Sequence, residues 1–149
     1  MKKTIVLLMI ATCFIIAALS GCGDDNGTNP VPSDLIGTWA WISATMDDVS
    51  MGTLEEVTEI TGADSLSYTY NANRSWSGAV YDASMNPLTT ASGTFSVKGD
   101  TLIMVISEED GIAVEPPDAD SILFTVTATT LVQYTVEAGH TFAVNFIKE

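Results

Sequence analysis

Positive charge is scarce in this sequence. Five Lys and Arg stand against 19 Asp and Glu among its 149 residues, which gives a formal net charge of −14 at pH 7. Proteins that bind nucleic acids neutralise phosphate groups with clustered Lys and Arg side chains. Five basic residues cannot form such a surface, so nucleic-acid binding is excluded as a function class. A chain of this length corresponds to a single domain.

Cysteine and histidine are scarce as well. The chain has two cysteines, Cys13 and Cys22, and one histidine, His140, which lies in a pattern typical of a turn. An ordinary zinc site needs several Cys or His ligands, and nothing around His140 resembles the context of a catalytic nucleophile. Acidic pairs such as Glu55 and Glu56 could serve glycoside hydrolysis, but 19 acids produce such pairs by composition alone. We expect no enzymatic activity, no metal site and no cofactor.

A single long hydrophobic run spans residues 4–19. Its 16 residues are fewer than the ~20 that a membrane-spanning helix needs. Lys2 and Lys3 precede the run, and the small residues Ser20 and Gly21 follow it. A basic start, an apolar stretch and small residues at a cleavage site are the order of a secretory signal. The sequence therefore predicts a signal peptide over residues 1–21.

The end of this segment, Leu19-Ser20-Gly21-Cys22, resembles the bacterial lipobox. The resemblance implies that signal peptidase II cleaves before Cys22 and that the thiol of Cys22 carries a diacylglycerol group. Two or three acyl chains, at ~0.8 kcal/mol per buried methylene, hold a protein at a membrane. Cys13 would leave with the signal, so no disulfide could form within the mature chain. An ordinary secretory signal with an incidental cysteine is the alternative.

The lipobox resemblance implies that residues 22–33 begin with a lipidated Cys22. The rest of this segment is rich in Gly, Pro, Asp and Asn, which predicts a flexible tether. Removal of Lys2 and Lys3 changes the net charge from −14 to −16, and anionic head groups repel such a protein. Gly23 stands where the common inner-membrane retention signal of lipoproteins has Asp. We expect a lipid-anchored protein of the bacterial cell envelope, at the outer membrane rather than the inner one, facing the periplasm or the surface.

Residues 34–149 show the pattern of β-strands. Apolar and aromatic residues recur at every second position, as in Leu66, Tyr68 and Tyr70, and no long stretch keeps a helical period. Short turn sequences such as Lys98-Gly99-Asp100 separate the runs and favour hairpins. The expected strands begin near Thr38, Leu54, Ser65, Ser75, Ala91, Thr101, Ser121, Leu131 and Thr141. We predict an all-β domain, an antiparallel up-and-down meander of about 8–9 strands that closes into a barrel.

Leu35-Ile36-Gly37-Thr38-Trp39 resembles the Gly-X-Trp signature of lipocalins and their bacterial lipocalin-like relatives. Residues 68–78 and 92–102 are similar to hairpins of lipocalin-like lipoproteins, so the resemblance covers about residues 34–149. It implies that Gly37 and Trp39 form a structural motif and that Trp39 closes one end of a small barrel. Lipocalins usually pack an arginine from near the last strand on this tryptophan, and here only Lys148 is available.

Aromatic residues gather on the early strands. Lipocalin-like barrels use inward aromatics to line an apolar pocket, which makes Trp41, Tyr68, Tyr70, Trp76 and Gly78 candidate ligand-binding residues. The alternative is that the same rings fill the interior of a narrow barrel. A glycine in the middle of a strand either admits a neighbouring ring or leaves space for a ligand.

Residues 108–120 are the longest expected loop, with many acids and two consecutive prolines. Asp110, Asp118 and Asp120 could bind calcium weakly, although their spacing differs from an EF-hand loop. A solvated acidic loop is favoured, because like charges repel and extend a chain. Its length also makes it a candidate rim or lid at the open end of a barrel.

Two functions from different classes remain open. The first is a lipid-anchored module that holds a small apolar ligand in its barrel. The second is a non-catalytic structural or interaction module with a filled core that acts on another envelope protein through its acidic loops. A cavity of ~300 Å³ or more would favour the first.

Overall fold

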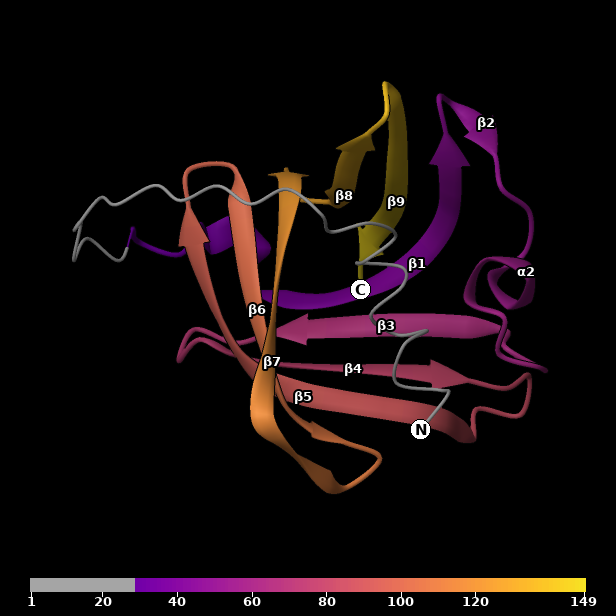
Figure 1. The fold of residues 1–149 in the computed structure, drawn as a ribbon, viewed down its shortest axis with the longest axis horizontal. Helices are drawn as coiled ribbons and strands as arrows, with labels where there is room; N and C mark the ends of the chain where they lie inside the picture. Colours follow the sequence, from indigo (N-terminus) through magenta and orange to yellow (C-terminus); the bar gives the residue numbers. More distant parts are fainter. Residues whose placement is uncertain (1–28) are drawn as a thin grey trace.

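The computed structural model describes residues 29–149, which form one antiparallel sheet with a short helix beside it (Figure 1). A 3-10 turn, η1 (Ser33–Leu35), precedes the sheet, and one helix, α2 (Leu54–Thr58), interrupts it. The strands are β1 (Gly37–Met46), β2 (Val49–Ser50), β3 (Ser65–Tyr70), β4 (Ser75–Tyr81), β5 (Pro87–Lys98), β6 (Thr101–Glu109), β7 (Ile112–Val126), β8 (Thr130–Glu137) and β9 (His140–Lys148).

The sheet closes into an eight-stranded barrel. Strands β3 to β9 pair with their neighbours in sequence order, β1 pairs with β3, and β1 also pairs with β9, which closes the ring. The short β2 pairs only with β1 and lies outside the ring. All pairings are antiparallel, so the predicted up-and-down barrel of eight or nine strands is confirmed.

Alternation along each strand decides which side chains enter the barrel. In β3, Leu66, Tyr68 and Tyr70 are buried, whereas the Ser and Thr between them are only partly covered. This is the period-two pattern of a strand with one face on a core. The turns at residues 71–74, 98–101 and 137–140 join neighbouring strands, as their sequences predict.

Strand β1 bends sharply along the barrel (Figure 1). Gly37 and Thr38 pair with β3, and Trp39 and Ala40 pair with both β3 and β9. After Ala40 the strand leaves β3 and continues with β9 alone. The register with β9 shifts between Trp41 and Ser43, which marks a β-bulge. Trp39, before the bulge, is fully buried, and Trp41, at the bulge, is only half-buried.

The strand predicted to begin near Leu54 is wrong, because residues 54–58 form α2. The side chain of Thr53 accepts a hydrogen bond from the backbone N–H of Glu56, and the Glu56 carboxylate accepts one from the backbone N–H of Thr53. This capping box satisfies N–H groups that a helix start leaves free. Leu54 and Thr58 then bury their side chains at the end of the barrel.

The loop predicted over residues 108–120 is also wrong. Strand β6 runs to Glu109, a turn at Asp110 and Gly111 follows, and β7 begins at Ile112. The two strands form a long hairpin that extends beyond the barrel body, at the bottom of Figure 1. Asp110 accepts a hydrogen bond from the Thr90 backbone. Within residues 29–149 no three His, Cys, Asp or Glu residues gather as a metal site would require.

Candidate functional site

The two ends of the barrel differ, and we call them the closed end and the open end. The closed end holds η1, the first residues of β1 and the last residues of β9. The open end holds β2, α2 and the β6–β7 and β8–β9 turns.

The Gly-X-Trp residues form the closed end. The Trp39 side chain is 0% exposed, and its indole N–H donates to the Leu35 carbonyl oxygen at 2.8 Å. Lys148 places its Nζ 5.2 Å from the centroid of the Trp39 ring and donates to the Asp34 carbonyl oxygen at 3.0 Å. Lys148 therefore makes a cation–π contact with Trp39 at this end of the barrel.

Gly37 is required at this end for two reasons. Its φ of +136° is a conformation that residues with a side chain rarely adopt. A Cβ atom at this position would also lie 2.7 Å from the Cε of Lys148. The glycine therefore lets the lysine stem cross the start of β1 and reach Trp39.

Aromatic rings fill the middle of the barrel. The Tyr68 ring lies 5.6 Å from Phe146 and 6.1 Å from Trp76 between centroids, and Tyr70 lies 5.2 Å from Phe95 in an edge-to-face pair. A Cβ on Gly78 would lie 2.5 Å from the Tyr68 ring. Of the two alternatives for this glycine, the structure has the first, because Tyr68 occupies the space above it.

The aromatic core also contains a short polar chain. The Gln133 side-chain amide donates to the Tyr70 hydroxyl oxygen at 2.8 Å, and that hydroxyl donates to the Met104 sulfur at 3.6 Å. Burial raises the pKa of both Tyr68 and Tyr70 well above the usual range, with the Asp120 charge adding to the effect at Tyr68. Both phenols are neutral hydrogen-bonding groups at physiological pH.

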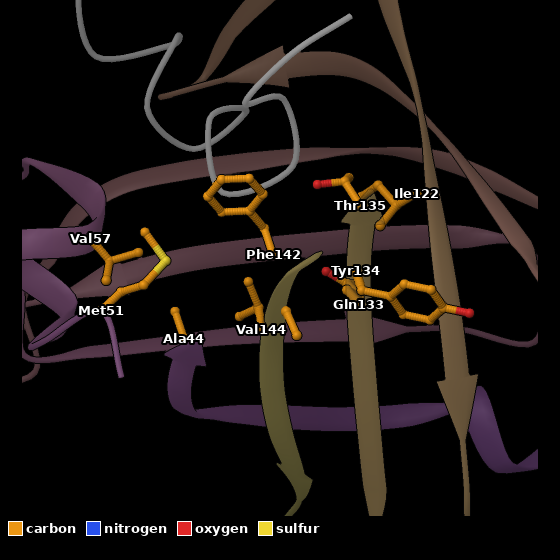
Figure 2. Close-up of a pocket in the computed structure, with 10 residues that line it drawn as sticks. Ala44, Met51, Val57, Ile122, Gln133, Tyr134, Thr135, Phe142 and Val144 are labelled. Carbon is orange, nitrogen blue, oxygen red and sulfur yellow. The ribbon is translucent and has the colours of Figure 1, made fainter. Parts of the chain in front are cut away.

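A cavity of about 70 Å³ lies at the open end (Figure 2). Its lining is mostly apolar and comes from the 44–57 segment on one side and from β7, β8 and β9 on the other. In Figure 2, Met51 and Val57 lie on one side of Phe142, and Thr135 and Ile122 lie on the other. The remaining labelled lining residues are Ala44, Gln133, Tyr134 and Val144.

The cavity exists because two neighbouring strands separate. The pairing of β7 with β8 covers only Leu123 to Val126 on β7 and ends at Tyr134 on β8. No ladder of hydrogen bonds therefore joins residues 135–137 of β8 to residues 112–122 of β7. We call the resulting gap between the two strands the seam. Ile122 and Thr135 stand on the two sides of this seam and line the cavity.

Asp120 lies on the inward face of β7, two residues before the lining residue Ile122, and does not itself line the cavity. Asp120, like Ile122 and Phe124, occupies one of the alternate positions of β7 that point inward, and it is only 5% exposed. One carboxylate oxygen accepts the Ser121 backbone N–H at 2.8 Å, and the other has no hydrogen-bond partner in the structure. Burial raises the pKa of Asp120 to about 6, and the charge of Asp118 acts in the same direction.

The candidate ligand-binding residues lie elsewhere. Tyr68, Tyr70, Trp76 and Gly78 belong to the filled interior, and Trp41 packs against the core with its indole N–H unpartnered. None of these residues is among those that line the open-end cavity. Cys22 and residues 1–21 lie outside the described residues.

Sequence reasoning missed the 51–57 side of the cavity, although a signal was present. Thr53 followed three residues later by Glu56 is the capping-box pattern that precedes a helix. The other side of the cavity is predictable in part, because the sequence alternation marks Phe142 and Val144 as inward residues of a strand. Nothing in the sequence marks where β7 and β8 separate.

At the rim of the open end, His140 pairs with Asp47. The imidazole Nδ1 lies 2.6 Å from a carboxylate oxygen of Asp47, and the Thr141 backbone N–H donates to the other oxygen at 2.8 Å. These bonds hold the pKa of Asp47 below its usual range, with the His140 contact as the larger cause. Both side chains are exposed, so the pair ties β1 to β9 at the surface.

The sequence matches no known family model and no curated protein. Within residues 29–149, no helix has the length and apolar character needed to cross a membrane.

Proposed function

We propose that this chain is a lipid-anchored envelope protein without catalytic activity, whose lipocalin-like barrel binds an apolar group of a small molecule at its open end. The observation that carries the proposal is the apolar cavity between the 44–57 segment and strands β7 to β9. Ligand sites in proteins are concave, mostly apolar and supplied with a few polar groups, which Gln133 and Thr135 provide here.

The size of the cavity limits what enters it. Pockets that enclose a whole drug-sized ligand measure ~300 to 1,000 Å³. This cavity measures about 70 Å³, which is below the size that would favour a whole ligand held inside the barrel. A cavity of this size accepts one ring or one short alkyl end, and the rest of the ligand lies along the seam. The aromatic interior is packed, so the ligand does not reach the centre of the barrel.

Ala44 offers a direct test, since its methyl group lines the cavity. In the Ala44→Leu variant the added methyl groups occupy the cavity, and we expect the affinity for the neutral fluorophore N-phenyl-1-naphthylamine to fall about tenfold or more. The matched control is Ala40→Leu, on the same strand outside the cavity, which should bind the probe as the parent does. Thermal melts check that both variants fold.

The proposal is supported if the parent binds the probe saturably, Ala44→Leu weakens this binding and Ala40→Leu leaves it unchanged. Absence of saturable binding by the parent would refute it. The acidic residues at the open end would then favour the other function, an envelope module that contacts another protein.

The lipid anchor has a test of its own. Cys22→Ser removes the thiol that would carry the acyl chains, so the protein should appear in the soluble fraction or remain unprocessed. Cell fractionation and palmitate labelling measure this result. Unchanged membrane retention without label would contradict lipidation, whatever the outcome of the ligand experiments.

A further inference from the structure

Asp120 is a buried carboxyl group without a complete set of partners. Its side chain is 5% exposed, and one of its oxygens, itself removed from solvent, accepts no hydrogen bond. Buried carboxylates are ordinarily paired or fully hydrogen-bonded, because desolvation penalises their charge. In the described part of the chain, the basic residues Arg74, Lys98 and Lys148 all lie at the closed end, away from Asp120.

The position of Asp120 connects it to the open-end cavity. Asp120 precedes Ile122 by two residues on the same inward face of β7, and Ile122 lines the cavity. Both residues belong to the stretch of β7 that β8 does not cover. Residues two apart on a strand lie ~7 Å apart on the same face, so a ligand whose apolar part contacts Ile122 can extend to the Asp120 carboxyl.

The groups around Asp120 favour a ligand that carries a positive charge. On the same strand Asp118 adds its negative charge, β6 presents the uncharged Met104 opposite Asp120, and β3 contributes Tyr68, whose raised pKa keeps it neutral. The rim of the open end carries many acids: Asp47 and Asp48 beside β2, Glu55, Glu56 and Glu59 at α2, and Glu108, Glu109 and Asp110 at the β6–β7 turn. His140 also lies at this rim, where it pairs with Asp47. A mouth lined by one sign of charge concentrates ions of the opposite sign.

We propose that the ligand of the open-end cavity is an amphiphilic amine, whose apolar part enters the cavity and whose ammonium group pairs with the Asp120 carboxylate. The inference rests on the proposed binding function and adds the charge of the ligand to it. An ammonium donates the hydrogen bonds that the free oxygen of Asp120 lacks. The pair forms where water is excluded, which strengthens a charge-assisted bond.

Three compounds with the same alkyl chain separate charge from apolar contact. Octylamine, octanol and octanoate each compete with N-phenyl-1-naphthylamine for the chain carrying Cys22→Ser. At pH 7.5 we expect octylamine to displace the probe at a concentration about tenfold below that of octanol, and octanoate to be the weakest competitor.

Asp120→Asn keeps the shape of the side chain and removes its charge. In this variant the advantage of octylamine over octanol should disappear, while octanol displaces the probe as before. Asp118→Asn is the matched control, because Asp118 carries the same charge two residues away on the same strand but is exposed. It should keep most of the preference for the amine.

The preference should also depend on pH. Asp120 binds a proton as the pH falls through about 6, whereas an alkyl ammonium, like a lysine side chain, stays charged over this range. The advantage of octylamine should therefore shrink between pH 7.5 and pH 5 in the parent and in Asp118→Asn. Asp120→Asn should show no such change.

The possible failures are distinguishable. If none of the three compounds and no probe binds the parent, the binding function itself is wrong. If octanol competes as well as octylamine, or if Asp120→Asn retains the preference, the cavity binds ligands but the role of Asp120 is refuted. Melting curves show whether Asp120→Asn is folded, and Asp120→Glu, which retains the charge, should restore part of the preference.

Discussion

The two ends of this barrel use the same sheet in opposite ways. At the closed end Trp39 is fully buried, η1 covers it with Leu35, and Lys148 spans the start of β1. At the open end α2 and β2 cover the barrel only partly, and a cavity remains between them and strands β7 to β9. Charge follows the same division, because the basic residues of the described part lie at the closed end and most of its acids lie at the open end.

Strand pairing explains the difference. The register shifts of the sheet lie between Trp41 and Ser43 in β1, Val80 and Tyr81 in β4, Ser92 and Gly93 in β5, and Ile106 and Glu108 in β6. These bulges fall toward the open end, where β1 also leaves β3 and β7 leaves β8. Bulges at barrel rims bend strands and redirect side chains. Regular pairing therefore makes a packed end, and interrupted pairing makes an end with space for a ligand.

The largest change in the free energy of unfolding is expected when one aromatic residue at each end is truncated to alanine. Trp39→Ala should lower the free energy of unfolding by about 3 to 5 kcal/mol, because it removes a fully buried ring and leaves a void. Phe142→Ala at the open end should cost about 1 to 2 kcal/mol, because that ring is only partly buried. Urea melts measure both values. Equal losses at the two positions would contradict the comparison.

Gly78→Leu tests whether the region between the two ends is solid. The new side chain would collide with the Tyr68 ring, which Tyr70, Trp76 and Phe146 hold in place. We expect a destabilisation of about 1 to 3 kcal/mol. The control is Ser77→Leu, one residue earlier on the exposed face of β4, which should change stability by less than about 0.5 kcal/mol. A neutral Gly78→Leu would mean that the interior has unfilled space.

Lys148→Met tests the contribution of charge at the closed end. Methionine keeps part of the apolar stem and loses the cation over Trp39 and the bond to the Asp34 carbonyl. We expect a loss of about 0.5 to 1 kcal/mol in urea melts. Lys148→Arg, which keeps the positive charge and adds a planar group that stacks on an aromatic ring, should match or exceed the parent stability. If Lys148→Met melts like the parent, packing alone closes this end.

Asp47→Asn tests the surface contact at the open end and should have the smallest effect. The pKa of Asp47 is lowered in the folded protein, so its ionised form stabilises the fold at pH above the ordinary Asp range. That contribution is lost as the pH falls through the lowered pKa. Acid titration of the melting temperature should show a slightly shallower decline for Asp47→Asn than for the parent. Asp48→Asn, at the neighbouring exposed position, should follow the parent curve.

Some parts of the fold and of the site can be predicted from the sequence, and others cannot. The alternation of Leu66, Tyr68 and Tyr70 predicts a strand with one buried face, because period two is a local property of extended backbone. The sequence around Leu54 does not reveal α2, because a five-residue helix is too short to show a helical period. Residues 112–120 look like a loop because their acids and prolines are uncommon in strands. In the structure, residues 112–113 and 118–120 pair with β6, and residues 114–117 between them have no partner on that strand.

Composition and local pattern by themselves determined the all-β class and the order of the hairpins. Each of these depends on residues close together in the chain or on totals over the chain. Only the tertiary structure decided that Tyr68 fills the space above Gly78, that Lys148 reaches Trp39, and that β7 and β8 separate beside Asp120. These features depend on the closure of β1 against β9, which joins the two ends of the sheet and sets which side chains meet.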